Sequence, residues 1–177
     1  MAQLIFRREK VYRQRTTPPS KDFKALYRFE ERNVEWLGSH FLGDSHERRG
    51  GALSSKERMQ VFLRYMGDPG FQKGIGEEIK IDQSTVSRTI LHVSQKILEK
   101  ADLWIQLPTE QTIAREKELW QHKYQFPTCI GAIDCTHVKI EKPGGPHADE
   151  YINRKNFASI NVQATVNAEE KFTSVDA

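Results

Sequence analysis

The sequence predicts an α+β protein, with helices in roughly its first two thirds and strands in its last third. The helices are indicated by apolar residues spaced three and four apart, most clearly Val86, Ile90, Val93 and Ile97. The strands are indicated by an apolar run over 129–140, followed by shorter runs over 159–167 and 172–175. These observations divide the chain into a basic arm (1–20), a helical region (21–107) and a region of strands (108–177).

Composition sets broad limits on function. The chain has 177 residues, of which 37% are hydrophobic and 29% charged, with a net charge of +3. No apolar run approaches the roughly 20 residues that cross a bilayer, so no membrane association is expected. The N-terminus does not read as a secretory signal, and Cys129 and Cys135 fall in one predicted strand that cannot fold back to bridge them, so a reducing compartment is expected. The mild positive charge permits nucleic-acid binding without requiring it.

Positive charge is concentrated at the N-terminus, which ends its first stretch in the helix-breaking run 16–20. This segment is either a basic arm that contacts an acidic partner or a solvated terminus with no specific role. The cations of the segment and the helix after it are Arg7, Arg8, Lys10, Arg13, Arg15, Lys21, Lys24 and Arg28, against Glu9 and Asp22.

The remaining elements follow in order along the chain. Apolar spacing predicts one amphipathic helix over 21–41, a second over 56–66 capped by Ser54 or Ser55, and a short third over 72–79. Asp82 is placed to cap the helix that carries the Val86 stripe. A charged, amphipathic stretch over 109–123 leads into the strands, and 167–171 predicts a turn between the last two.

Residues 74–88 read as a helix-turn-helix, in which the second helix opens with small polar side chains. In this motif the start of the second helix enters the major groove of DNA. The alternative is a plain helical hairpin with solvated polar residues, and Glu77 and Glu78 would repel phosphate unless they point away. The predicted DNA-binding residues, which lie off the apolar stripe, are Gln83, Ser84, Thr85, Ser87 and Arg88.

Asp134 is the first candidate for chemistry, because it is a single carboxylate within the apolar run 129–140. We expect this run to form a buried strand. An ionised carboxylate taken out of water needs a positive partner or a metal ion. The sequence therefore predicts that Asp134 binds a cation.

Four motifs in order carry a resemblance to a known family: residues 131–138, 151–155, 159–164 and 172–175. With the helix-turn-helix upstream, they resemble the Harbinger/PIF-type transposases and the nucleases derived from them. The resemblance implies a ribonuclease-H-like α/β domain whose DDE triad, two aspartates and a glutamate, holds divalent metal ions, Mg²⁺ or Mn²⁺. By the same resemblance Asp134 is the first aspartate, both a catalytic residue and a metal ligand.

The Gly-Ser-x-His-Asp-type motif of the second aspartate and the later glutamate do not occur before Ala177. The resemblance thus implies a truncated domain with the first three strands only. Asn167, where many relatives carry aspartate, is interpreted as a substitution between two good turn formers. Since two-metal cleavage needs clustered carboxylates, we expect this chain to bind metal poorly and not to cut DNA.

Other polar residues near Asp134 have weaker claims. Asp149 and Glu150 are interpreted as solvated loop residues. Asp176 is expected on one strand face with Ser174 and Phe172, but it does not match the second aspartate of the family's triad. His137 leaves its strand on the face opposite to Asp134. The histidines and cysteines show no zinc spacing. Arg154 and Lys155 either contact DNA phosphate or belong to an exposed basic loop.

Three functions remain open at this point. The first is a transposase-derived DNA endonuclease, inactive as this fragment. The second is a non-catalytic DNA-binding module, a relic or a domesticated fragment. The third is a scaffold for a partner, since the resemblance implies a separate Myb-like DNA-binding protein, with a second copy of the chain as another candidate partner. The resemblance also implies a nuclear location, with the cytoplasm as the alternative.

Overall fold

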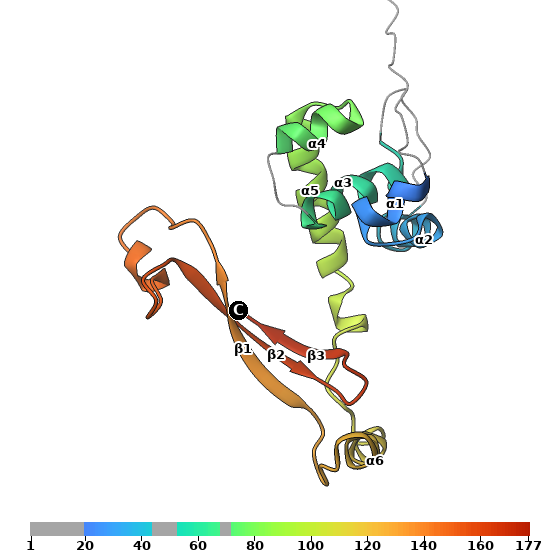
Figure 1. The fold of residues 1–177 in the computed structure, drawn as a ribbon, viewed down its shortest axis with the longest axis vertical. Helices are drawn as coiled ribbons and strands as arrows, with labels where there is room; N and C mark the ends of the chain where they lie inside the picture. The colour runs from blue at the N-terminus through green and yellow to red at the C-terminus, as the bar shows by residue number, and fades with distance from the viewer. Residues whose placement is uncertain (1–19, 44–52, 68–71) are drawn as a thin grey trace, which may run out of the picture. The chain divides into compact units, whose positions relative to one another are not determined.

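The computed structural model describes residues 20–43, 53–67 and 72–177 (Figure 1). The predicted basic arm lies outside these residues, apart from Ser20. The chain divides into two compact units, residues 1–100 and 101–177, which are described separately. The first unit is helical and the second carries a three-stranded sheet, so the α+β prediction is confirmed.

The first unit contains five described helices: α1 (Ser20–Tyr27), α2 (Glu31–Leu42), α3 (Ser55–Gly67), α4 (Gln72–Ile79) and α5 (Gln83–Leu98). The prediction of a single helix over 21–41 is wrong, because the helix is interrupted between α1 and α2. Arg28 adopts a left-handed backbone conformation there, with φ of 63°. The apolar spacing continues across the break, so periodicity alone does not reveal it.

Two apolar clusters hold these helices together. The larger joins α1, α2, α3 and α5 through Phe23, Tyr27, Val34, Met59 and Val93. The smaller joins α3, α4 and α5 through Val61, Ile75 and Val86. The Val86 stripe of α5 therefore faces both clusters, as the spacing predicted.

Capping explains where two of these helices begin. Ser54 caps α3: its Oγ accepts the backbone N–H of Glu57 at 3.2 Å, and the Glu57 carboxylate accepts the backbone N–H of Ser54 at 2.8 Å. This reciprocal pair is a capping box. Of the two predicted caps, Ser54 is therefore the one that caps α3, and Ser55 is its first residue. Asp82 stands at the N-cap of α5 but makes no side-chain cap hydrogen bond, so only its predicted position is confirmed.

The second unit contains α6 (Ile113–Tyr124) and the strands β1 (Ala132–Lys139), β2 (Ser159–Val166) and β3 (Phe172–Asp176). Two short 3₁₀ segments, 101–103 and 148–151, complete it. The strands are antiparallel in the order β1-β2-β3. Figure 1 shows β2 between the two edge strands, an arrangement consistent with the first three strands of a ribonuclease-H-like domain.

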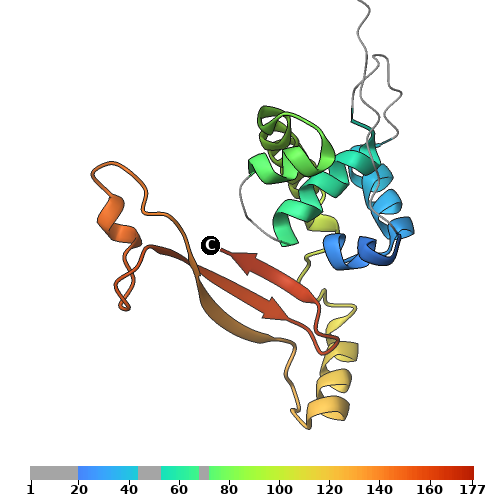
Figure 2. The same ribbon diagram turned by 45° about the horizontal axis from the view of Figure 1, so that its top comes forward.

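Side chains fix the ends of this sheet. At the predicted β2–β3 turn, Asn167 Oδ1 accepts the backbone N–H groups of Glu169 and Lys171, both at 3.0 Å. Helix α6 meets this turn, where Lys123 Nζ donates to the Ala168 carbonyl at 2.9 Å (Figure 2). Trp120 and Ala168 are both buried at this end of the unit.

Cys129 precedes β1 instead of lying in it, and both cysteines are free. The part of the chain that the structure describes contains no helix long and apolar enough to cross a membrane.

Candidate functional site

Asp134 lies in the first half of β1, where it pairs with Ala164 of β2. Its Oδ1 accepts the backbone N–H of Cys135 at 2.8 Å. The expectation of a buried strand is wrong, because all eight residues of β1 are exposed. Burial of a strand depends on what covers its two faces, and α6, the one long helix described in this unit, meets the sheet at its end.

The two faces of the sheet differ sharply in polarity. Side chains alternate along each strand, and paired residues share a face. The register therefore assigns each paired strand residue to one face of the sheet. Apart from Asp134 and Thr136, the face that carries Asp134 is apolar, consisting of Ala132, Val138, Ile160, Val162, Ala164, Val166, Phe172 and Val175. Among the strand residues described, Asp134 is thus the one carboxylate on an otherwise apolar face.

Asp176 does not join Asp134. It pairs with Gln163, which pairs with Cys135, so the register places Asp176 on the opposite face and two strands away. The predicted common face of Asp176 and Phe172 is also wrong. The β2–β3 register shifts between Thr165 and Val166 and leaves Thr173 as an extra residue, which moves Phe172 to the Asp134 face.

The acidic residues of the loop after β1 are engaged by basic neighbours. Asp149 Oδ1 accepts a hydrogen bond from Lys142 Nζ at 2.6 Å, and this bond, with the lysine charge, holds the pKa of Asp149 below its usual value. Glu150 Oε1 lies 2.6 Å from His147 Nδ1. The contacts described for these two carboxylates join them to Lys142 and His147 and not to Asp134.

The described residues do not make a complete site for divalent metal. Residues 20–43, 53–67 and 72–177 contain no cluster of three or more His, Cys, Asp or Glu side chains placed to hold a metal ion. Asp134 offers carboxylate oxygens, the ligand type that Mg²⁺ prefers, but it stands without a second acid on its face. No metal-dependent step can therefore be derived from these residues alone.

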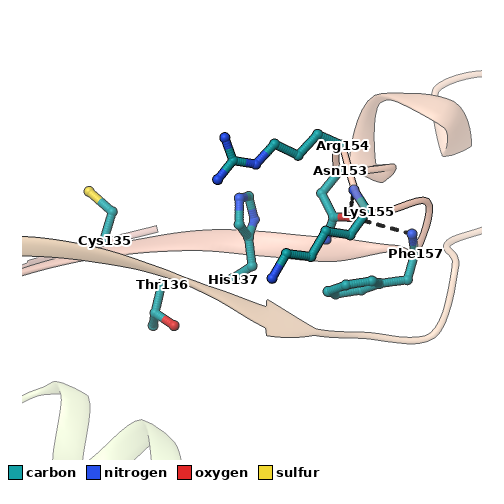
Figure 3. Close-up of a pocket in the computed structure, with 7 residues that line it drawn as sticks. All are labelled: Cys135, Thr136, His137, Asn153, Arg154, Lys155 and Phe157. Carbon is teal, nitrogen blue, oxygen red and sulfur yellow. Dashed lines mark hydrogen bonds between the residues drawn. The ribbon is translucent and has the colours of Figure 1, made fainter.

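The other face of β1 carries a hollow of about 280 Å³, shown in Figure 3. Cys135 and His137 point into it from β1, on the face opposite to Thr136 and therefore to Asp134. Thr136 of β1 also lines the hollow, and Asn153, Arg154, Lys155 and Phe157 line it from the loop before β2. The structure thus brings Arg154 and Lys155 to β1, across the sheet from Asp134.

Asn153 holds this loop in shape. Its Oδ1 accepts the backbone N–H of Lys155 at 2.9 Å, and its Nδ2 donates to Ser159 Oγ at 2.8 Å. Ser159 Oγ in turn shares a hydrogen bond of 3.1 Å with His137 Nδ1. These roles of Asn153 and Ser159 were not predicted, although the two residues lie in the motifs 151–155 and 159–164.

The predicted DNA-binding residues of the first unit lie together in the first two turns of α5. Gln83, Ser84, Ser87 and Arg88 are exposed and Thr85 is half-buried, while Val86 points into the core. Gln83 Nε2 donates to Gln72 Oε1 of α4 at 2.9 Å, and Arg88 Nε donates to the Ser84 carbonyl at 3.1 Å.

The turn before α5 is tight. Lys80 has φ of 62°, and the backbone N–H of Ile81 donates to the Gly76 carbonyl at 2.8 Å. The two acids of α4 are each near a cation: Glu78 lies 3.3 Å from Arg64 of α3, and Glu77 lies 3.9 Å from Lys73. These pairs offset part of the negative charge that would oppose DNA.

Comparison with known proteins shows what the second unit is similar to. Residues 133–177 match the DDE superfamily endonuclease family. A rat protein named "Putative nuclease HARBI1" is 29% identical over 141 residues, which cover 77% of this chain and 40% of the relative. The human protein of the same name is 29% identical over 129 residues, covering 72% and 36%.

A plant relative extends the similarity along nearly the whole chain. The Arabidopsis thaliana protein named "Protein ALP1-like" is 25% identical over 176 residues, covering 95% of this chain and 42% of its own length. No solved structure matches. The chain spans about two fifths of the length of the curated relatives it matches. The predicted resemblance to the transposase-derived DDE nucleases is therefore confirmed, and residues 133–177 are the segment that matches the endonuclease family.

Proposed function

We propose that this chain is part of a metal-dependent DNA endonuclease and that Asp134 is one of its metal-binding carboxylates. The observation that carries the proposal is the position of Asp134. It is the single acid on an apolar sheet face, within the segment that matches the endonuclease family. Because β1 is exposed, an unpaired carboxylate there costs little stability, and the support for a role in chemistry is its place in the matched segment.

The 177-residue chain should not cleave DNA by itself. Metal-assisted phosphodiester hydrolysis uses two ions, which activate water and stabilise the attacking and leaving oxygens. Several carboxylates are needed to hold these ions close together, and Asp134 is one. The remaining acids would come from elsewhere in a longer product of the same gene or from another chain.

A plasmid-nicking assay tests this proposal. The 177-residue chain is incubated with supercoiled DNA and Mg²⁺ or Mn²⁺, beside Asp134→Asn and the matched control Asp176→Asn, which removes a carboxylate from the opposite face. We expect no nicking above background from any of the three. Sustained nicking that Asp134→Asn abolishes and Asp176→Asn preserves would refute the statement that this chain is inactive.

The same assay is applied to any longer product of the gene, once the 3′ end of its transcript is mapped. A product that supplies a Gly-Ser-x-His-Asp motif and a later glutamate should nick DNA, and Asp134→Asn should abolish the activity. If that product nicks DNA equally well with Asp134→Asn, Asp134 is not a catalytic residue.

A second function, DNA binding without catalysis, is favoured by a different observation. The exposed polar side chains at the start of α5 lie on a compact helical unit with two apolar clusters of its own. We propose that this end of α5 contacts duplex DNA, with Arg88 on a base or phosphate and Gln83, Ser84, Thr85 and Ser87 as further contacts.

Binding of duplex DNA at several salt concentrations tests this second proposal. If Arg88 contacts one phosphate, Arg88→Ala should weaken binding and reduce the slope of log K against log salt by about 0.9. Lys96→Ala is the matched control, because Lys96 lies near the other end of α5 and pairs with Glu99 at 2.7 Å. Equal effects of the two substitutions would contradict binding through the start of α5.

Location and partners are proposed on the same basis. A DNA substrate implies a nuclear location, which a fluorescent fusion confined to the cytoplasm would contradict. A Myb-like DNA-binding protein and a second copy of the chain are the proposed protein partners. Co-purification and sedimentation of the full chain test them separately.

A further inference from the structure

The hollow beside His137 gathers three donor groups that have no partner among the described residues. The guanidinium of Arg154, the ammonium of Lys155 and Nε2 of His137 all belong to its lining, and none makes a hydrogen bond or ion pair there. Elsewhere in this unit Lys142 and Lys171 are paired with acids at 2.6 and 3.0 Å. The cations of the hollow are thus available to a ligand.

No carboxylate lines the hollow. Asp176 shares this face of the sheet, but the register places it two strands from Cys135, about 10 Å at the usual strand spacing. Positive charge is therefore not neutralised inside the hollow, which favours an anionic ligand. Arg154 adds a planar fork of N–H donors that suits the oxygens of a phosphate group.

The hydrogen-bond chain from Asn153 through Ser159 to His137 orients the imidazole ring. Asn153 Nδ2 donates to Ser159 Oγ, which leaves the serine hydroxyl free to donate to His137 Nδ1. In the tautomer in which Nδ1 accepts this bond, the ring proton lies on Nε2, which is then a donor. The ring is fixed through Nδ1, so this donor is positioned before a ligand arrives.

We propose that this hollow is a phosphate-binding site for a DNA strand, formed by Arg154, Lys155 and His137, with Asn153 and Ser159 as positioning residues. The inference deepens the proposed function and rests on DNA as the substrate. The phosphate bound here is not the one that is cut. His137 lies three residues along β1 from Asp134, about 10 Å, and on the opposite face of the strand. The site therefore holds the strand at a second position.

Two measurements on the full chain, without divalent metal and with EDTA, test the site. The first is the affinity for a single-stranded octathymidylate, which avoids the duplex binding proposed for α5. The second is the set of His137 ring signals in NMR spectra during titration with inorganic phosphate, the octathymidylate or its uncharged methylphosphonate analogue. Arg154→Ala is compared with Lys117→Ala, which removes an exposed cation from α6, and His137→Gln keeps an N–H donor near the Nε2 position.

We expect Arg154→Ala to weaken octathymidylate binding about 10-fold, as loss of a charge-assisted contact does, and to reduce the salt slope by about 0.7. Lys117→Ala should change the affinity less than about twofold, and His137→Gln should retain more affinity than His137→Ala. The His137 signals should move with the octathymidylate in the parent chain and in Lys117→Ala. They should not move in Arg154→Ala.

Movement of the His137 signals with inorganic phosphate as well supports recognition of the phosphate group itself. Movement with the octathymidylate alone supports a phosphodiester in a strand. Equal effects of Arg154→Ala and Lys117→Ala, unmoved His137 signals, or equal binding of the methylphosphonate analogue would each overturn the proposal. These measurements use no metal, so their outcome is independent of cleavage. If phosphate binding at the hollow is not found, the nuclease proposal still stands. If the longer product does not nick DNA, the phosphate-binding proposal still stands.

Discussion

Replacing Gly76 by alanine should destabilise the helical unit, whereas the same replacement at Gly74 should not. Both glycines lie in α4, two residues apart. A Cβ at Gly76 would lie 2.7 Å from the Ile81 carbonyl oxygen, which belongs to the turn before α5. A Cβ at Gly74 would meet nothing within 4 Å. The pair therefore separates the effect of the tight turn from the effect of removing a helical glycine.

The expected change in the free energy of unfolding is the balance of one stabilising and two destabilising effects. Alanine is favoured over glycine in a helix by about 1 kcal/mol, which alone would stabilise both variants. At Gly76 the backbone must shift to relieve the contact, and overpacking of this kind costs about 1–3 kcal/mol. The shift also disturbs the 2.8 Å hydrogen bond from Ile81 N to the Gly76 carbonyl, worth about 1 kcal/mol. The net loss for Gly76→Ala is then about 1–3 kcal/mol.

Urea unfolding of the full chain, followed by far-ultraviolet circular dichroism, measures both variants. Gly76→Ala should lower the midpoint and also the melting temperature, by about 4–8 °C for each kcal/mol in a unit of this size. Gly74→Ala should leave both unchanged or raise them slightly. If Gly76→Ala is as stable as Gly74→Ala, the close packing of α4 against the turn before α5 is wrong.

Three further predictions follow from single residues. Val86 is fully buried, so Val86→Ala should lower the free energy of unfolding by about 2–3 kcal/mol, and an unchanged urea midpoint would contradict its place in the core. Asn167→Ala should lower the unfolding free energy of the sheet unit by about 1–2 kcal/mol because two backbone N–H groups lose their acceptor, while Asn167→Asp should not; equal midpoints would contradict this role. Lys142→Ala should raise the lowered pKa of Asp149 toward its usual value in an NMR titration. The stabilisation from this pair is present above the usual pKa of Asp149 and is lost as the pH falls through the lowered one, so an unmoved pKa would exclude the pair.

Helices and turns could be predicted well from local signals. Val86 and Val93 occupy the core positions that their spacing indicates. The turn at Asn167 forms where turn residues are concentrated. The break at Arg28 could not be predicted, since a left-handed conformation at arginine has no sequence signal and the apolar spacing continues through it.

The sheet shows the limit of strand patterns. The alternation along β2 identifies its apolar face, but an extra residue in β3 changes the face of Phe172 without any change in composition. Burial of β1 could not be predicted from β1 itself, because it depends on groups that cover the sheet. The hollow beside His137 could not be predicted from the sequence either, because hydrogen bonds of Asn153 in the loop before β2 bring Arg154 and Lys155 to β1.

A titration with Mn²⁺ tests most directly whether Asp134 is the metal-binding acid of this chain. Paramagnetic broadening of backbone amide signals in the full chain reports which residues lie near the ion. The expected result is weak binding, with the first broadening at Asp134, Cys135 and the paired Ala164, and its loss in Asp134→Asn. Broadening centred on Asp149 and Glu150 or on Asp176, with Asp134→Asn behaving as the parent chain, would contradict the assignment of Asp134 as a metal ligand.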